Sequence, residues 1–221
     1  MEKLISAVTD FLITLPVILI ALSVHELCHG YAAYCLGDST AKHMGRLSMN
    51  PLHHIDPIGF LCLIFFKVGW AKPVSVDTRF FKNPKRDMAL CALAGPASNF
   101  ALAFLFSFAY VFTIKIGIDN GYYWNETAGA FQVIYQMIGY MVSINLGLAV
   151  FNLIPIPPLD GSKILYAFLP NHLLYRILSY ERYIQLGMFV LLWFGVLSGP
   201  INTVVMFFFQ LFMNIAGGVI L

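Results

Sequence analysis

Long apolar segments constrain the fold of this chain more than any other feature of its sequence. The first segment runs from about Leu4 to Leu36. As one helix it would extend roughly 50 Å, whereas the hydrocarbon core of a bilayer is about 30 Å thick. Such a helix must tilt, bend near Pro16 or emerge into the headgroup region. We therefore expect a spanning helix here that is longer than the membrane requires.

Further apolar segments follow at about 58–66, 88–116, 130–154, 184–197 and 201–221. The segment 58–66 is too short to cross a bilayer and predicts a re-entrant or interfacial helix. Hydrophobic residues make up 59% of the chain and charged residues only 11%, whereas soluble domains carry about 25% charged residues. We predict an all-α integral membrane protein, a bundle of about five or six transmembrane or re-entrant helices. The alternation of Val74 and Val76 adds a short β-hairpin or loop on the cytosolic side.

The positions of the basic residues predict the orientation in the membrane. All but Lys3 and Lys115 of the thirteen Lys and Arg residues lie within 37–87 or 160–182. Cytoplasmic loops carry an excess of Lys and Arg. We therefore expect these two regions on the cytosolic side, and the N-terminus and loop 117–129 on the outside.

No repeat, low-complexity tract or linker marks a second domain. We expect one membrane-embedded domain over 1–221, with a core at about 4–165 and C-terminal helices at about 183–221. The net charge of +2 provides no strong basic field, so we expect the lipid bilayer and no nucleic acid as a partner.

The strongest chemical signal is His25-Glu26-Leu27-Cys28-His29, which lies inside the first apolar segment. Residues four apart share a face of a helix, so both imidazoles can bind one metal ion. The adjacent Glu26 can then reach a water molecule at the metal and act as its base. Alternatively, the histidines only hydrogen-bond to neighbouring helices. That arrangement would leave the Glu26 carboxylate in an apolar span without a cation to offset its desolvation.

Two histidines leave a zinc ion short of a third protein ligand. Asp160 is the best candidate, because it follows a different span whose helix must end at Pro155, Pro157 and Pro158. Irregular backbone at membrane depth is tolerated where it lines a cavity. The alternative is an ordinary interfacial turn, since Asp-Gly favours turns in any case.

Together these motifs resemble the site-2 protease family of intramembrane metalloproteases, the M50 type, in its compact bacterial form without a PDZ domain. The second motif is Asn152-Leu-Ile-Pro155-Ile-Pro157-Pro158-Leu-Asp160-Gly161. Three further stretches carry the resemblance: Arg46-Leu-Ser-Met-Asn50-Pro51 with His54-Ile-Asp56-Pro57-Ile-Gly59, Gly69-Trp70-Ala71-Lys72-Pro73-Val74, and Gly95-Pro96-Ala97-Ser98-Asn99.

The resemblance implies one zinc ion per chain, held by His25, His29 and Asp160, with Glu26 activating the water. It also implies that Asn152 lies near the scissile carbonyl and steadies the oxyanion. A helix–helix hydrogen bond is an equally good reading of Asn152. An extended substrate could pair with an edge strand at Trp70–Val76.

Two further polar residues have simpler interpretations. His54 is either a group near the ligands or substrate, or an interfacial histidine beside lipid headgroups, and the interfacial reading is favoured. Asn99 is expected to let helices pack closely, together with Gly95 and Pro96.

The implied activity is cleavage of single-pass transmembrane proteins or remnant peptides, in a prokaryotic plasma membrane, with the active site toward the cytosol. The connecting segments are too short for an attached PDZ or nucleotide-binding module. Substrate selection would therefore depend on the membrane part or on a separate regulatory membrane protein. The main alternative is a catalytically silent membrane scaffold of the same fold. A zinc transporter is disfavoured, because the polar residues gather at one depth and do not line a path.

Overall fold

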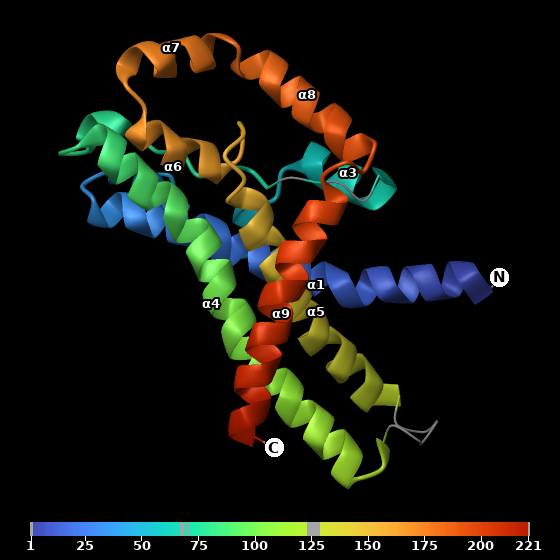
Figure 1. Cartoon of the computed structure of the whole chain (residues 1–221). Helices are drawn as coiled ribbons and strands as arrows, with labels where there is room; N and C mark the ends of the chain where they lie inside the picture. Colours follow the sequence, from blue (N-terminus) through green and yellow to red (C-terminus); the bar gives the residue numbers. More distant parts are fainter. Residues whose placement is uncertain (1, 67–68, 70, 123–128, 221) are drawn as a thin grey trace.

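The computed structural model describes residues 2–66, 69, 71–122 and 129–220, and within them the fold is helical. Four helices are long and apolar enough to cross a membrane (Figure 1): α1 (Glu2–Cys35), α4 (Pro84–Asp119), α5 (Gly129–Asn152) and α9 (Ser198–Ile220). Shorter helices connect them: α2 (Thr40–His43), α3 (Pro57–Phe66), α6 (Asp160–Phe168), α7 (Asn171–Ser179) and α8 (Glu181–Trp193). Two 3₁₀ turns, η1 (Pro51–His53) and η2 (Thr78–Phe80), complete the described elements.

The prediction of an all-α membrane bundle is confirmed. Four helices have the length and composition of spans, and the two short apolar helices α3 and α8 bring the apolar helices to six. At 13 residues, α8 is about 20 Å long and too short to cross the hydrocarbon core. The last apolar segment, expected at about 201–221, forms the span-length helix α9. The polar link before α8 is also helical, and α6, α7 and α8 form an arch at one end of the bundle (Figure 1).

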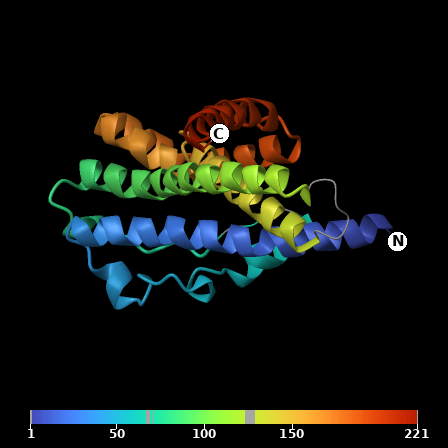
Figure 2. The same cartoon turned by 90° about the horizontal axis from the view of Figure 1, so that it is seen from below.

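Helix α1 is continuous and contains Pro16 (Figure 2). At 34 residues it is about 51 Å long, so it exceeds the thickness of the hydrocarbon core, as its sequence predicted.

Helix α4 is the centre of the packing and contacts α1, α5, α6 and α9. Ala103 of α4 packs with Val142 and Leu146 of α5, and the aromatic side chains of Phe208 and Phe212 on α9 cover this cluster. The small side chain of Ala103 lets the helices approach closely, as is typical of helix packing in membranes. Because α1 also contacts α5, residues of α1, α4 and α5 meet inside the bundle.

The expected β-hairpin is not formed by the described residues. Residues 71–77 are extended and make one isolated antiparallel bridge, between Ile55 and Ala71, in which the N–H of Lys72 donates to the carbonyl of His54 at 2.8 Å. The N–H of Asp77 donates to the buried carboxylate of Asp38 at 2.7 Å, just beyond the end of α1. This extended segment therefore forms a loop, which was the predicted alternative to the hairpin, and hydrogen bonds hold it at both ends. Trp70, where the predicted edge strand begins, lies outside the described residues.

Candidate metal centre

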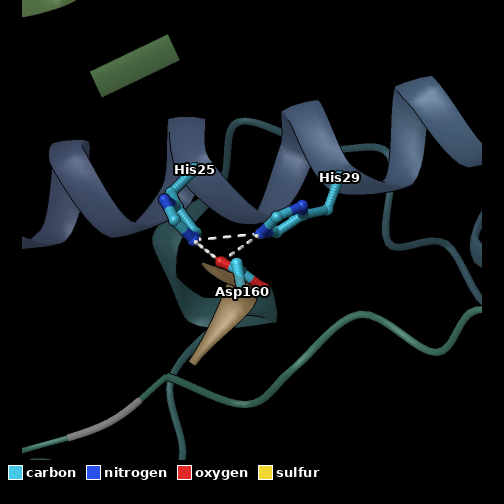
Figure 3. Close-up of side chains that lie close together, drawn as sticks. All are labelled: His25, His29 and Asp160. Carbon is cyan, nitrogen blue, oxygen red and sulfur yellow. Dashed lines mark hydrogen bonds and ion pairs between the residues drawn. The ribbon is translucent and has the colours of Figure 1, made fainter. Parts of the chain in front are cut away.

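The structure brings the three predicted ligands together (Figure 3). His25 and His29 project from successive turns of α1, and Asp160, the first residue of α6, points up between them. The Nε2 atoms of the two histidines are 3.0 Å apart, and the Oδ2 atom of Asp160 is 3.1 Å from each of them. All three side chains are buried. Three donor atoms, from parts of the chain more than 130 residues apart, thus form a nearly equilateral triangle.

The other ring nitrogen of each histidine makes a hydrogen bond that fixes its tautomer. The Nδ1 atom of His29 is 2.7 Å from the backbone carbonyl oxygen of Cys91 on α4. A carbonyl oxygen only accepts hydrogen bonds, so this Nδ1 carries the proton. In a neutral imidazole the Nε2 atom of His29 is then an unprotonated lone pair that faces the triangle.

His25 is fixed in the same way by a chain of side-chain amides. The Nδ1 atom of His25 is 2.6 Å from Oδ1 of Asn99, and Nδ2 of Asn99 donates to Oδ1 of Asn145 at 2.7 Å. The Nδ2 atom of Asn145 in turn donates to the carbonyl of Met141 at 2.8 Å. Each amide is thereby oriented, so that Oδ1 of Asn99 is an acceptor and the Nδ1 atom of His25 carries the proton.

With both imidazoles neutral, three lone pairs therefore converge at about van der Waals contact, an arrangement that is repulsive unless a metal ion or a proton lies among them. Zinc binds histidine nitrogens and carboxylate oxygens at about 2.0–2.2 Å in tetrahedral geometry, which separates the ligand atoms by about 3.4 Å. The observed separations of 3.0–3.1 Å are close to that value. The donor set fits a zinc ion with three protein ligands and a fourth position left for water or substrate.

The end of α5 explains how Asp160 reaches this point. The helix ends at Asn152, because Pro155, Pro157 and Pro158 cannot continue it, and the chain folds back sharply before α6 begins. Gly161 allows this fold: a Cβ atom there would lie 2.3 Å from the carbonyl oxygen of Leu153. The irregular stretch thus places a carboxylate beside the first helix.

The charge of Asp160 is favoured by its neighbours. Burial alone would raise the pKa of its carboxyl, but the contacts with His25 and His29 and the nearby Lys163 ammonium hold that pKa below its usual range. Lys163 bonds Oδ1 of Asp160 at 3.1 Å, which leaves Oδ2 directed at the histidines. Asp160 is therefore ionised, which is the form of a carboxyl group that binds a metal ion.

Gly95 makes room for both imidazoles. A Cβ atom at this position of α4 would lie 2.4 Å from Nε2 of His29 and 2.7 Å from Cε1 of His25. The expectation of close packing at Gly95 is therefore correct, and the neighbours are the two candidate ligands themselves.

Glu26 and Asn152 line the same cavity as the triangle, a space of about 160 Å³. The Oε2 atom of Glu26 accepts a hydrogen bond from the backbone N–H of Val74 at 2.9 Å, so the extended segment holds this carboxylate. The side-chain amide of Asn152 donates to the carbonyl of Leu148 at 3.0 Å. That partner belongs to its own helix, not to a neighbouring helix.

Sequence reasoning missed the roles of three buried polar residues. Asn99 does more than allow close packing, since it bonds His25, and Asn145 was not singled out at all. The available signal was a polar side chain in an apolar span, which is costly in lipid without a partner. The favoured interfacial reading of His54 is wrong, because its side chain is buried, with 2% exposure. It is enclosed by the segment around η1 and α3, a contact that no local pattern encodes.

Comparison with known proteins agrees with this geometry. The sequence profile described as Peptidase family M50 matches residues 13–198, and no PDZ-domain profile matches the chain. The chain is 38% identical over 167 residues to YwhC of Bacillus subtilis, named "Putative zinc metalloprotease", with 75% of this chain and 73% of that protein covered. It is 30% identical over 175 residues to Rip2 of Mycolicibacterium smegmatis, a protein of the same description, with 76% and 60% covered.

The similarity extends beyond bacteria. MJ0611 of Methanocaldococcus jannaschii, which has the same description, is 33% identical over 109 residues, 49% of each chain. No solved structure gives a significant match. The span-length helices make this chain a multi-pass membrane protein, and the matched profile and relatives show that it belongs to peptidase family M50.

Proposed function

We propose that this protein is an intramembrane zinc metalloprotease of the site-2 type, which hydrolyses peptide bonds in transmembrane or membrane-proximal segments. The observation that carries the proposal is the convergence of two histidine lone pairs and one carboxylate oxygen within 3.1 Å. One zinc ion per chain would be held by His25, His29 and Asp160. Membership in a peptidase family with relatives named as zinc metalloproteases supports the same assignment.

Bound zinc supplies a Lewis acid that makes water nucleophilic near neutral pH. Glu26 would take the proton from the water that attacks the amide carbon and would then deliver it to the leaving nitrogen. The N–H of Val74 holds one carboxylate oxygen of Glu26, which restricts the side chain to the cavity that it shares with the ligands. Asn152 lines that cavity too, and its amide would stabilise the oxyanion once it turns away from the carbonyl of Leu148.

The position of the site in the bundle supports a class of substrate. A transmembrane helix satisfies its peptide groups internally, so the substrate must unwind before the amide can be attacked. The extended segment 71–76, beside Glu26, would hold the unwound chain by backbone pairing. The substrates would be single-pass membrane proteins or remnant peptides, selected with or without a separate regulatory membrane protein. The basic segments support a site that faces the cytosol. The resemblance to the compact bacterial form supports a prokaryotic cell membrane.

The first test is the zinc content of detergent-purified protein. We expect one zinc per chain in the wild type, and loss or marked weakening of binding in His25→Ala and Asp160→Ala. His172→Ala, which removes an exposed histidine, is the matched control and should keep its zinc. Unchanged zinc in Asp160→Ala would exclude Asp160 as a ligand.

Glu26→Gln separates metal binding from chemistry. It should keep zinc and lose cleavage by about 100-fold or more, the size of a general-base contribution. Cleavage is measured by N-terminal labelling and mass spectrometry of membranes that contain the wild type or the variant. If zinc is bound but both proteins yield the same termini, the chain is a silent scaffold and the protease assignment is wrong.

A further inference from the structure

A second cavity, of about 450 Å³, lies beside the metal centre. Its walls come from α1, α5, the segment 51–60, Gly69 with Ala71, and Leu192 of α8. Most of its lining is apolar, including Leu19, Leu22, Phe60, Ile144, Leu148 and Phe151. The mechanism above does not use this space, which we call the apolar cavity.

We call the space of about 160 Å³ that contains the candidate ligands the catalytic cavity. The apolar cavity and the catalytic cavity share three walls. On α1, Ser23 lines the apolar cavity and His25 lines the catalytic cavity. On α5, Phe151 lines the apolar cavity and its neighbour Asn152 lines the catalytic cavity. The extended segment contributes Ala71 to the first cavity and Pro73 and Val74 to the second. A peptide that lies along this segment over the metal centre therefore reaches the apolar cavity within two or three residues.

His54 lines the apolar cavity and has an unused hydrogen-bonding atom. Its Nε2 atom is 2.8 Å from the carbonyl oxygen of Ser48, and because a carbonyl only accepts, Nε2 carries the proton. In the neutral ring Nδ1 is then an acceptor. This atom is buried and has no hydrogen-bond partner among the residues that the structure describes. A buried unpaired acceptor is costly, and a donor on the occupant of the cavity would remove that cost once the ring turns Nδ1 toward the cavity.

An unwound stretch of a membrane helix has both required properties. Its side chains are apolar, and unwinding frees backbone N–H groups that lipid cannot satisfy. We propose that the apolar cavity binds the unwound apolar residues adjacent to the scissile bond, and that Nδ1 of His54 accepts a hydrogen bond from one of their backbone N–H groups. This assignment rests on the proposed protease function and makes His54 a substrate-binding residue. A lipid acyl chain would fill the space but has no donor for Nδ1.

Binding is measured without turnover, on zinc-loaded Glu26→Gln in detergent, so that its result does not depend on cleavage. The probe is a fluorescent synthetic peptide of about 20 leucines and alanines between pairs of lysines. A central Gly-Pro weakens its helix. Versions with one N-methylated residue, placed at each of the four positions on either side of Gly-Pro, remove single N–H donors. Fluorescence anisotropy gives the Kd.

Two variants of Glu26→Gln test the cavity and the hydrogen bond separately. Gly147 lines the cavity, and a Cβ atom there meets no atom within 4 Å, so Gly147→Phe fills the space without a backbone clash. Gly218→Phe is the matched control, since Gly218 is a helical glycine on α9 that is equally open. His54→Gln keeps an amide donor near Ser48 but has no acceptor at the place of Nδ1. Equal zinc content shows that each variant is folded.

We expect Gly147→Phe to raise the Kd of the peptide at least tenfold and Gly218→Phe to leave it unchanged. His54→Gln should raise it about five- to tenfold, the effect of one hydrogen bond. N-methylation of the peptide at one position should weaken its binding by a similar factor, and only when His54 is present.

Peptide binding that is absent, or unaffected by Gly147→Phe, would overturn the assignment. Native mass spectrometry that shows Gly147→Phe to lose a copurified lipid while peptide binding is unchanged would assign the cavity to lipid. N-methylation effects that persist in His54→Gln would remove His54 from the contact.

Discussion

The two adjoining cavities share α1, α5 and the extended segment 71–76, yet their side chains are held in different ways. In the catalytic cavity His25 bonds Asn99, His29 bonds the carbonyl of Cys91, and Glu26 bonds the N–H of Val74. In the apolar cavity the lining side chains have few polar groups, and Nδ1 of His54 has no partner among the described residues. Hydrogen bonds thus fix the polar side chains of the catalytic cavity, while the apolar cavity is an open space with few polar contacts.

The two cavities meet different physical requirements within one fold. Chemistry requires donor atoms placed within a fraction of an ångström, and hydrogen bonds to neighbouring segments of the chain supply that precision here. Recognition of apolar segments requires volume and few polar constraints, because many sequences must fit. Substitutions in the two cavities should therefore have effects of different kind and size.

A methyl group added at Gly95, beside the two imidazoles, and at Gly147, in the apolar cavity, gives the largest expected contrast. Gly95→Ala places its Cβ atom 2.4 Å from Nε2 of His29, so the imidazoles must move and zinc affinity should fall by about 100-fold or more. Gly147→Ala adds its Cβ atom to open space and should keep wild-type affinity. Zinc titration against a competing chelator measures both. Equal affinities in the two variants would show that the catalytic cavity is not tightly fitted.

Removing the amide behind His25 gives the next largest effect. Asn99→Ala leaves Nδ1 of His25 without its acceptor, and loss of such a partner typically costs 10- to 100-fold in metal affinity. Asn99→Asp keeps an acceptor and should recover much of the loss. Asn120→Ala, at the exposed end of the same helix, is the control. The same chelator titration would contradict this role of Asn99 if Asn99→Ala binds zinc like the wild type.

The smallest of these effects concerns the boundary between the cavities. Val74→Pro removes the N–H that holds Glu26, and a hydrogen bond to a charged group contributes about 1.5–3 kcal/mol, so kcat should fall at least tenfold with zinc unchanged. Val74→Ala keeps that N–H and should stay within about threefold of wild type. Rates are compared on a substrate found by N-terminal labelling. A loss shared by Val74→Ala would point to the side chain and not to the N–H.

The local parts of the site could be predicted from the sequence. The spacing of His25 and His29 places them on one helical face whatever surrounds them, and the apolar segments predict the apolar helices but not the helices of the polar link. Asp160 was also predicted, because three prolines mark the end of a span at the same depth. The first two inferences use only neighbours along the chain, and the inference about Asp160 adds the membrane depth at which its span ends.

Contacts between distant segments could not be predicted. Asn99 faces His25 because α4 crosses α1 at Gly95, and the burial of His54 depends on how the segment around η1 folds against α1. The alternation of Val74 and Val76 predicted a hairpin, but the N–H of Val74 bonds Glu26 and does not join a strand ladder. Each of these outcomes was decided by tertiary packing, which overrides local propensity.

The separation of the ligands along the chain has a consequence for biosynthesis. Asp160 follows His29 by 131 residues, and the two spans α4 and α5 are made between them. A nascent chain that has entered the membrane only as far as Asn152 has both histidines but lacks the carboxylate. The proposed three-ligand site would be complete only after the ribosome has produced α6. Tight zinc binding would therefore follow the insertion of the bundle and would link α1 to α6.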